Sequence, residues 1–169
     1  MHSFSRHFFS GIFLMGLTIS AQAQNAGTEI QTDLPGEKIA APPYGMPITL
    51  AQAERVIMAA KTEAARLKSN VIVIAVADTH GELVAFARLD DATVHSIAFA
   101  QLKARGAARS RRVTATPPTA MAAALTAMPD FVAMPGGIPI VVGGKTIGAV
   151  GVSGGNDLQI AKAAVKALQ

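Results

Sequence analysis

Two pairs of short apolar segments constrain the fold of this chain more than any other feature of its sequence. Val71–Ala77 is a continuous run of β-branched and small apolar residues, typical of a buried strand, and Leu83–Arg88 follows after a turn that contains glycine. Ile138–Val142 and Thr146–Val152 form a second pair around a Gly-Gly-Lys turn. Each pair therefore predicts a β-hairpin.

Helical patterns occupy the segments around the two hairpins. Residues 50–68 begin with a Thr-x-x-Gln capping box and repeat apolar side chains every three or four positions. Further helices are predicted over residues 93–109, 119–127 and 154–168. The predicted order is α-β-β-α-α-β-β-α. Two hairpins separated by helices indicate the α+β class, with an antiparallel sheet on which the helices pack.

The N-terminus has the three parts of a secretory signal peptide. After a short basic start, Phe8–Ile19 is an apolar stretch of 12 residues, and Ala21–Ala23 has the small-x-small pattern of a cleavage site. A transmembrane anchor is the weaker interpretation, because a bilayer core needs about 20 apolar residues. We therefore expect residues 1–23 to be removed, no transmembrane span to remain, and the protein to be periplasmic or secreted.

The next segment, residues 24–48, contains several prolines and glycines and no periodic apolar face. It is predicted to be an extended arm or linker that is ordered only against another subunit. Residues 49–169 then form one domain of ordinary size.

The composition excludes several classes of protein. With no cysteine, the chain has no disulfide, thiolate metal site, cysteine nucleophile or covalently attached haem. Half of the 169 residues are hydrophobic and 15% are charged, which excludes an intrinsically disordered chain. The net charge is +4, but expected export and few aromatic residues argue against nucleic acid as a partner.

The glycine-rich end of the last predicted strand allows more than one interpretation. Gly151–Gly155 matches the Gly-x-Ser-x-Gly elbow of a serine hydrolase, but no histidine follows Ser153, which argues against a catalytic triad. The backbone N–H groups of Gly154, Gly155 and Asn156 could instead bind a carboxylate or phosphate at the start of the last helix. The alternative is a turn that binds no ligand.

Five cations fall within ten residues near the end of the second predicted helix. Cations in this position complement the helix dipole and need no other role. They could also bind an anionic ligand or an acidic partner. The five are Lys103, Arg105, Arg109, Arg111 and Arg112.

Only two histidines, His80 and His95, follow the predicted signal peptide. Their spacing matches no zinc motif, so a closed zinc site is not expected. A haem iron needs only one axial side chain, because the apolar porphyrin supplies most of the affinity. Each histidine is therefore a candidate metal ligand, although a histidine in such a place is more often a solvated residue of a turn or a helix end.

An ordered set of short motifs runs from Ile48 to Leu168. These are Ile48-Thr49-Leu50-x-x-Ala53, the segment from Val76 to Asp90 with Asp78, Gly81, Phe86 and Arg88, Lys103-Ala104 with Ala107-Ala108, Pro135-Gly136-Gly137-Ile138-Pro139-Ile140, and Ile147–Gly154. In this order the motifs resemble the GlcG/HbpS-like haem-binding proteins, and the resemblance covers nearly the whole predicted domain.

The resemblance implies a profilin-like α+β fold, with a central antiparallel sheet flanked by helices. It also implies a homo-oligomer, from a dimer to an octamer. Some exported members of the family bind haem and act in haem sensing, storage or iron handling, whereas others are accessory proteins encoded near small-acid metabolism. The chain departs from the family where the last helix begins, since Asp157 is followed by Leu158 instead of glutamate.

The leading hypothesis is an exported protein that binds haem b without a covalent bond and takes part in haem or iron handling or sensing. His95 or His80 would supply the axial ligand. Arg105, Arg109 or Arg112 would pair with the haem propionates, because arginine binds carboxylates with two parallel hydrogen bonds.

Two alternatives remain. The chain could be an accessory protein or enzyme that binds a small organic acid, held by Arg88 and the loop Gly154–Asn156. It could also be a structural oligomer that docks on an exported or membrane sensor partner. An enzymatic activity is the less expected outcome, because no catalytic constellation stands out in the sequence.

Overall fold

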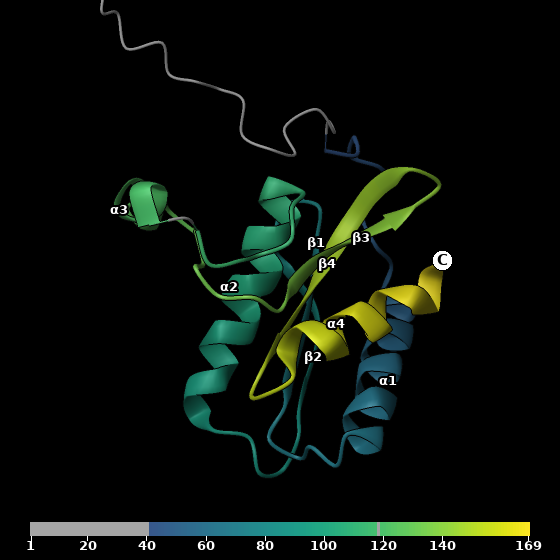
Figure 1. Ribbon diagram of the computed structural model, residues 1–169. Coiled ribbons are helices and arrows are strands. Elements are labelled where there is room, and N and C mark those ends of the chain that lie inside the picture. Colours follow the sequence, from purple (N-terminus) through teal and green to yellow (C-terminus); the bar gives the residue numbers. More distant parts are fainter. Residues whose placement is uncertain (1–40, 118) are drawn as a thin grey trace, which may run out of the picture. The chain divides into compact units, whose positions relative to one another are not determined.

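The computed structural model describes residues 41–117 and 119–169, in which four strands form one sheet (Figure 1). The sheet has the order β2-β1-β4-β3, and each neighbouring pair is antiparallel. The strands are β1 (Val73–Asp78), β2 (Leu83–Arg88), β3 (Gly137–Val142) and β4 (Lys145–Ser153). The two predicted hairpins, the antiparallel sheet and the α+β class are confirmed. The predicted signal peptide, residues 1–23, lies outside the described residues.

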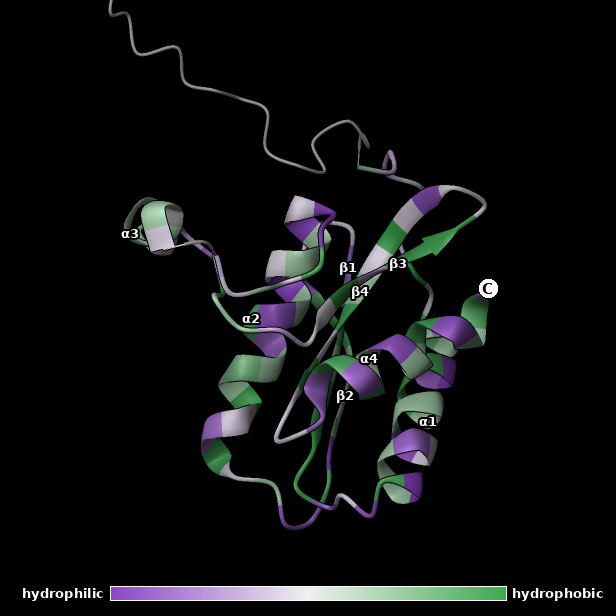
Figure 2. Cartoon of the chain, viewed as in Figure 1, coloured by the Kyte–Doolittle hydropathy of each residue, from purple (hydrophilic) through white to green (hydrophobic). Residues whose placement is uncertain are grey.

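Helices cover both faces of this sheet. α1 (Leu50–Arg66) and α4 (Asp157–Val165), which continues into the 3-10 turn η1 (Lys166–Leu168), share one core with the side chains of Ile72, Ile74 and Val76. α2 (Val94–Ser110) packs on the opposite face, against Val73, Ala75 and Ala77. α3 (Thr119–Thr126) stands apart from the sheet (Figure 1). Figure 2 shows that the strands between the helices are predominantly hydrophobic. None of the helices described is long and apolar enough to span a bilayer.

Three predicted boundaries shift for local reasons. β1 begins at Val73 because the ladder starts where Val73 pairs with Arg88, and Val71 is 38% exposed. α1 ends at Arg66, two residues early, because Lys68 has a φ of 54°. α4 begins at Asp157 because the φ angles of Gly154 and Gly155, 136° and 139°, lie outside the helical range.

The last residues of the predicted arm lie along the first residues of β4. Thr146 donates its N–H to Pro43 O (2.8 Å), and Gly45 donates to Thr146 O (2.8 Å). Ile48 then donates to Ile147 O (2.7 Å). Residues 41–48 are therefore fixed against the sheet, whereas residues 24–40 of the predicted arm lie outside the described residues.

Small residues bring α2 very close to the sheet. Four of the six buried residues of α2 are alanines, and this face rests on Gly151 and Ala149 of β4 and on Ala75 of β1. A Cβ atom added to Gly151 would collide with the backbone of α2, at Ala100 O and Ala104 N. Glycine at 151 is therefore required by the close approach of helix and strand.

We expect the substitution Gly151→Ala to reduce the free energy of unfolding by about 2–3 kcal/mol, because an added methyl group must push α2 away from β4. Urea unfolding followed by circular dichroism measures the change. Ala98→Val on the exposed side of α2 is the control and should cost less than about 1 kcal/mol. If both variants lose the same free energy of unfolding, the close approach of α2 to β4 is not the cause of the loss.

Candidate functional site

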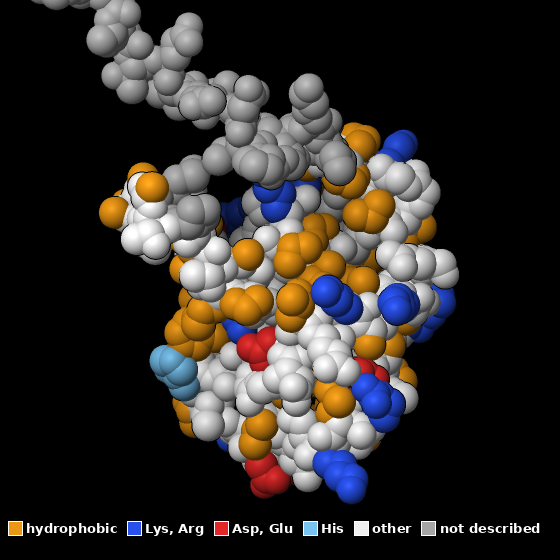
Figure 3. Space-filling model, viewed as in Figure 1, with side chains coloured by type: hydrophobic (Ala, Val, Ile, Leu, Met, Phe, Trp, Pro, Cys, Tyr) orange, Lys and Arg blue, Asp and Glu red, His pale blue; other side chains and the backbone are white. Residues whose placement is uncertain are grey.

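The outer side of α2 combines a histidine with exposed apolar side chains. His95 is exposed in the first turn of α2, which Thr93 caps by accepting a hydrogen bond from Ser96 N. The ring of His95 contacts that of Phe99 edge to face, with centroids 4.3 Å apart and an interplanar angle of 62°. Val94 beside it is 73% exposed, and Leu102 is 38% exposed. Figure 3 shows hydrophobic side chains grouped over α2 and the loop after it, beside a histidine.

The nitrogen atoms of His95 make no hydrogen bond to any described residue. One of them can therefore serve as a ligand without breaking an internal contact. Among the described residues, no three His, Cys, Asp or Glu side chains are grouped so that they could hold a metal ion.

Arg88 lies at the same end of α2 as His95. Its Nε and Nη2 atoms donate to Ala92 O, at 3.2 and 2.8 Å, just before the helix begins. The side chain of Arg88 is on the α2 side of the sheet, because Arg88 pairs directly with Val73. The structure thus places a cation just before the start of α2, the helix that carries His95 in its first turn, and the sequence did not predict this.

The other end of α2 holds the tip of the first hairpin. Arg109 donates from Nε to His80 O (2.8 Å), and Arg105 donates from Nε to Gly81 O (3.3 Å). Gly81 has a φ of 85°, as its place in the turn predicted, and an added Cβ would meet both arginine side chains at 2.9 Å. The hairpin tip is therefore clamped to the helix by hydrogen bonds to its main chain.

The same two arginines are already paired with carboxylates. Arg109 forms an ion pair and a hydrogen bond with Asp130 and lies 3.5 Å from Glu82. Arg105 lies 3.8 Å from Asp130 and 3.9 Å from Glu82. Binding of an external carboxylate would have to displace these internal partners.

The predicted haem residues therefore fall into separate places. His80 lies with Arg105 and Arg109 at the hairpin tip, where its side chain is 78% exposed and Nδ1 is 3.8 Å from Asp78 Oδ2. His95 precedes Arg105 by ten residues, which corresponds to about 15 Å along a helix. Arg112 is exposed beyond the end of α2. The three arginines therefore lie toward the other end of α2 from His95.

One N–H group of the predicted anion loop is already bonded to a side chain of the protein itself. Gly155 N donates to Asp157 Oδ1 at 2.7 Å, and Asn156, at a φ of 55°, makes no side-chain capping bond. Arg88 is two strands away, because it pairs with Val73, which in turn pairs with Ser153. The structure does not assemble Arg88 and the loop Gly154–Asn156 into one site.

Lys103 is the residue whose role the sequence interpretation missed. Its side chain is 2% exposed, and Nζ donates to Asp157 Oδ2 (2.6 Å) and Val152 O (3.0 Å). Lys103 lies three residues after Ala100 and just before Ala104, on the buried face of α2. This spacing was visible in the sequence, but the partner lies 54 positions away. The ion pair joins α2 to the start of α4.

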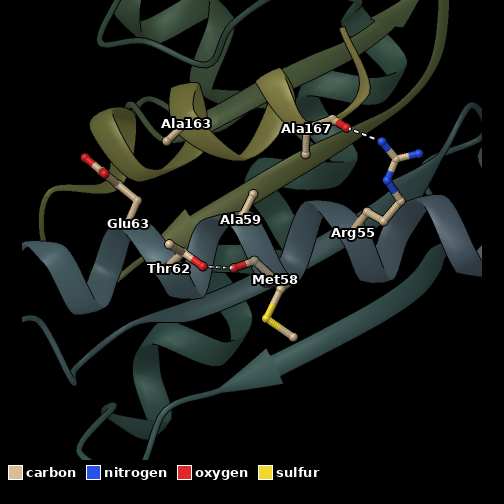
Figure 4. A pocket seen from close by; sticks show the side chains of 7 residues that line it. All are labelled: Arg55, Met58, Ala59, Thr62, Glu63, Ala163 and Ala167. Carbon is tan, nitrogen blue, oxygen red and sulfur yellow. Dashed lines mark hydrogen bonds between the residues drawn. The ribbon is translucent and has the colours of Figure 1, made fainter.

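A shallow groove runs between α1 and α4 (Figure 4). It is a hollow of about 500 Å³ with an apolar floor that includes Ala59, Ala163 and Ala167. Its charged groups already have partners. Arg55 Nη2 donates to Ala167 O at 2.6 Å. Glu63 accepts hydrogen bonds from two other residues of the same helical layer.

Glu63 is held at the edge of this groove by Arg66 and Gln159. Arg66 donates to the two carboxylate oxygens at 2.7 and 2.8 Å, and Gln159 donates at 3.0 Å. The hydrogen bonds from Arg66 lower the pKa of Glu63 to about 2, so the carboxylate is ionised at neutral pH. The groove therefore has an apolar floor, and the charged side chains that line it, Arg55 and Glu63, already make hydrogen bonds within the protein.

Comparison with known proteins supports the family resemblance. Residues 48–169 match the family model described as "Haem degrading protein HbpS-like". The chain is 41% identical to Protein GlcG of Escherichia coli strain K12 over 100 residues, which are 57% of this chain and 75% of GlcG.

Three solved structures share the fold. The crystal structure of a PduOC:heme complex has a TM-score of 0.65 at 26% identity and covers 73% of this chain and 96% of that one. A double mutant of HbpS from Streptomyces reticuli has a TM-score of 0.67 at 27% identity, over 80% and 94%. Protein ORFY of Klebsiella pneumoniae has a TM-score of 0.67 at 28% identity, over 77% and 96%.

We expect Asp157→Leu to reduce the free energy of unfolding by about 3–5 kcal/mol, because it leaves the Lys103 ammonium buried without a counter-charge. The double variant Lys103→Met/Asp157→Leu should recover most of this loss, since no charge is then buried. Urea unfolding of both variants tests the pair. A double variant as unstable as Asp157→Leu alone would contradict the assignment.

Proposed function

Because the chain belongs to the HbpS-like family, we propose that it binds haem b without covalent attachment and acts outside the cytosol in haem or iron handling. The observation that carries the proposal is the match of residues 48–169 to a family described as haem degrading. The similarity to the PduOC:heme complex supports it independently. The lack of cysteine requires a non-covalent site.

The outer side of α2 fits this group best. His95 offers a ring nitrogen that makes no internal hydrogen bond, and the adjacent Phe99, Val94 and Leu102 offer the apolar surface that a porphyrin face needs. Bound haem would supply an iron centre, and His95 is the residue that would hold it. His80 is the weaker candidate, because it stands in a network of paired charges.

Arg88 is the cation best placed for a propionate of haem at this site. It lies near the start of α2, and only its Nε and Nη2 atoms are occupied, both by Ala92 O. Arg105 and Arg109 already pair with Glu82 and Asp130. Arg88 can add a carboxylate partner without losing an internal ion pair.

We expect haemin titrated into the purified domain to give a shifted Soret band. His95→Ala should lose that shift or weaken binding at least tenfold, since an axial ligand is removed. His80→Ala is the matched control and should bind as the unaltered protein does. Retention of the same spectrum in His95→Ala, or its loss in His80→Ala alone, would contradict the choice of ligand.

Export and assembly are further parts of this proposal. The signal-like segment supports export, and the family resemblance supports a homo-oligomer that could present haem to an exported or membrane sensor partner.

Expressed at its full length in a Gram-negative host, the protein should be recovered outside the cytosol with a mature N-terminus at Gln24. Mass spectrometry of the periplasmic and medium fractions measures this. An uncleaved chain confined to the cytosol would contradict export.

A further inference from the structure

The end of the domain at which α2 stops carries basic side chains that the proposed haem site does not use. The last turn of α2 and the turn between β3 and β4 both lie at this end (Figure 1). The segment before α1 connects them, because Gly45 N donates to Thr146 O on β4 (2.8 Å). Tyr44 Oη donates to Arg109 O in the last turn of α2 (2.8 Å). We call this surface the basic end, and its members are Tyr44, Met46, Arg111, Arg112, Val113 and Lys145.

Tyr44 joins the parts of the basic end to one another. Its ring lies against the guanidinium of Arg111, whose central carbon is 4.8 Å from the ring centroid. Arg111 Nη1 also donates to Pro42 O at 3.2 Å. On the other side, a Cβ added to Gly45 would lie 3.0 Å from Lys145 Cβ. The basic end is therefore one continuous surface that contacts within the folded domain hold together.

The three cations of the basic end have no carboxylate partner among the described residues. The carboxylates around the adjoining β1–β2 tip already pair with Arg105 and Arg109 of α2. None of the ion pairs within residues 41–117 and 119–169 includes Arg111, Arg112 or Lys145. Since Arg112 and Lys145 are also exposed, their charges face whatever lies against this end of the domain.

Exposed apolar side chains stand among these cations. Met46 is 83% exposed, Val113 is 49% exposed and Tyr44 is 45% exposed. Val113 directly follows Arg112, and Met46 follows the glycine that lies beside Lys145. Cations, aliphatic side chains and a tyrosine on one surface match the boundary between lipid headgroups and acyl chains.

We propose that the basic end docks on an anionic lipid surface. Arg111, Arg112 and Lys145 lie against the headgroup phosphates, and Met46 and Val113 insert between the headgroups. Charge complementarity carries this step, because each lysine or arginine beside an anionic bilayer adds to the attraction. An acidic protein or a nucleic acid fits less well, because a hydrophilic polyanion gives the exposed apolar side chains nothing to pack against. The inference depends neither on haem nor on His95.

Sedimentation with lipid vesicles tests the proposal. The form used is residues 24–169, which keeps every described element and lacks the apolar segment 8–19, a segment that would itself enter a bilayer. We expect binding to vesicles of equal parts phosphatidylglycerol and phosphatidylcholine to be about tenfold stronger than binding to phosphatidylcholine alone, and to weaken as salt is added. Equal binding to the two kinds of vesicle would overturn the proposal.

Two double variants locate the contact. Arg112→Gln/Lys145→Gln should weaken binding to the anionic vesicles about tenfold, because it removes two of the three cations. Lys61→Gln/Lys162→Gln removes the same net charge from exposed positions on α1 and α4, and this matched control should bind as the unaltered protein does. If both double variants weaken binding to the same extent, the basic end is not the contact.

Met46→Gln separates a lipid surface from an acidic macromolecule. It should weaken binding to the anionic vesicles several-fold, because an apolar contact is lost, whereas Met58→Gln, at an exposed position on α1, should not. Circular dichroism shows that the fold of each variant is intact. Binding to polyglutamate as tight as to the vesicles, with no loss in Met46→Gln, would assign the surface to an acidic macromolecule and overturn the proposal.

Discussion

The close approach of α2 to the sheet is the constraint on which the rest of the structure depends. It is possible only because Gly151 has no side chain and the helix presents alanines. One helix can then cover a face of four strands and still reach, along its length, both the end of β2 and the tip of the β1–β2 hairpin. A larger side chain at 151 would separate α2 from β4 and loosen the clamps at both ends of the helix.

The packing of α2 also determines which charged side chains are paired within the protein. Lys103 faces the sheet because its neighbours on α2 are buried alanines, and the ammonium then needs an anion. Asp157 supplies it and also accepts the Gly155 N–H, which occupies the loop that otherwise offered an anion site. Arg105 and Arg109 are likewise bound to carboxylates. The charges that looked available in the sequence mostly hold the fold, and the outer side of α2 near His95 remains open.

The hairpins and helices could be predicted because their signals are local. β-branched runs joined by glycine turns, and apolar residues at helical spacing, depend only on neighbours in the sequence. The candidate site could be predicted only in part. The sequence identified His80 and His95 as candidate ligands. Only the fold shows that they lie near opposite ends of α2. The ion pairs of Lys103 with Asp157 and of Arg109 with Asp130 join distant segments, so the sequence alone could not show which cations have an internal carboxylate partner.

The described surface around His95 is suited to a particular kind of ligand. The surface around His95 offers an imidazole, aromatic and aliphatic side chains and a nearby guanidinium, which is a mixture suited to a flat ligand with an iron centre and carboxylates.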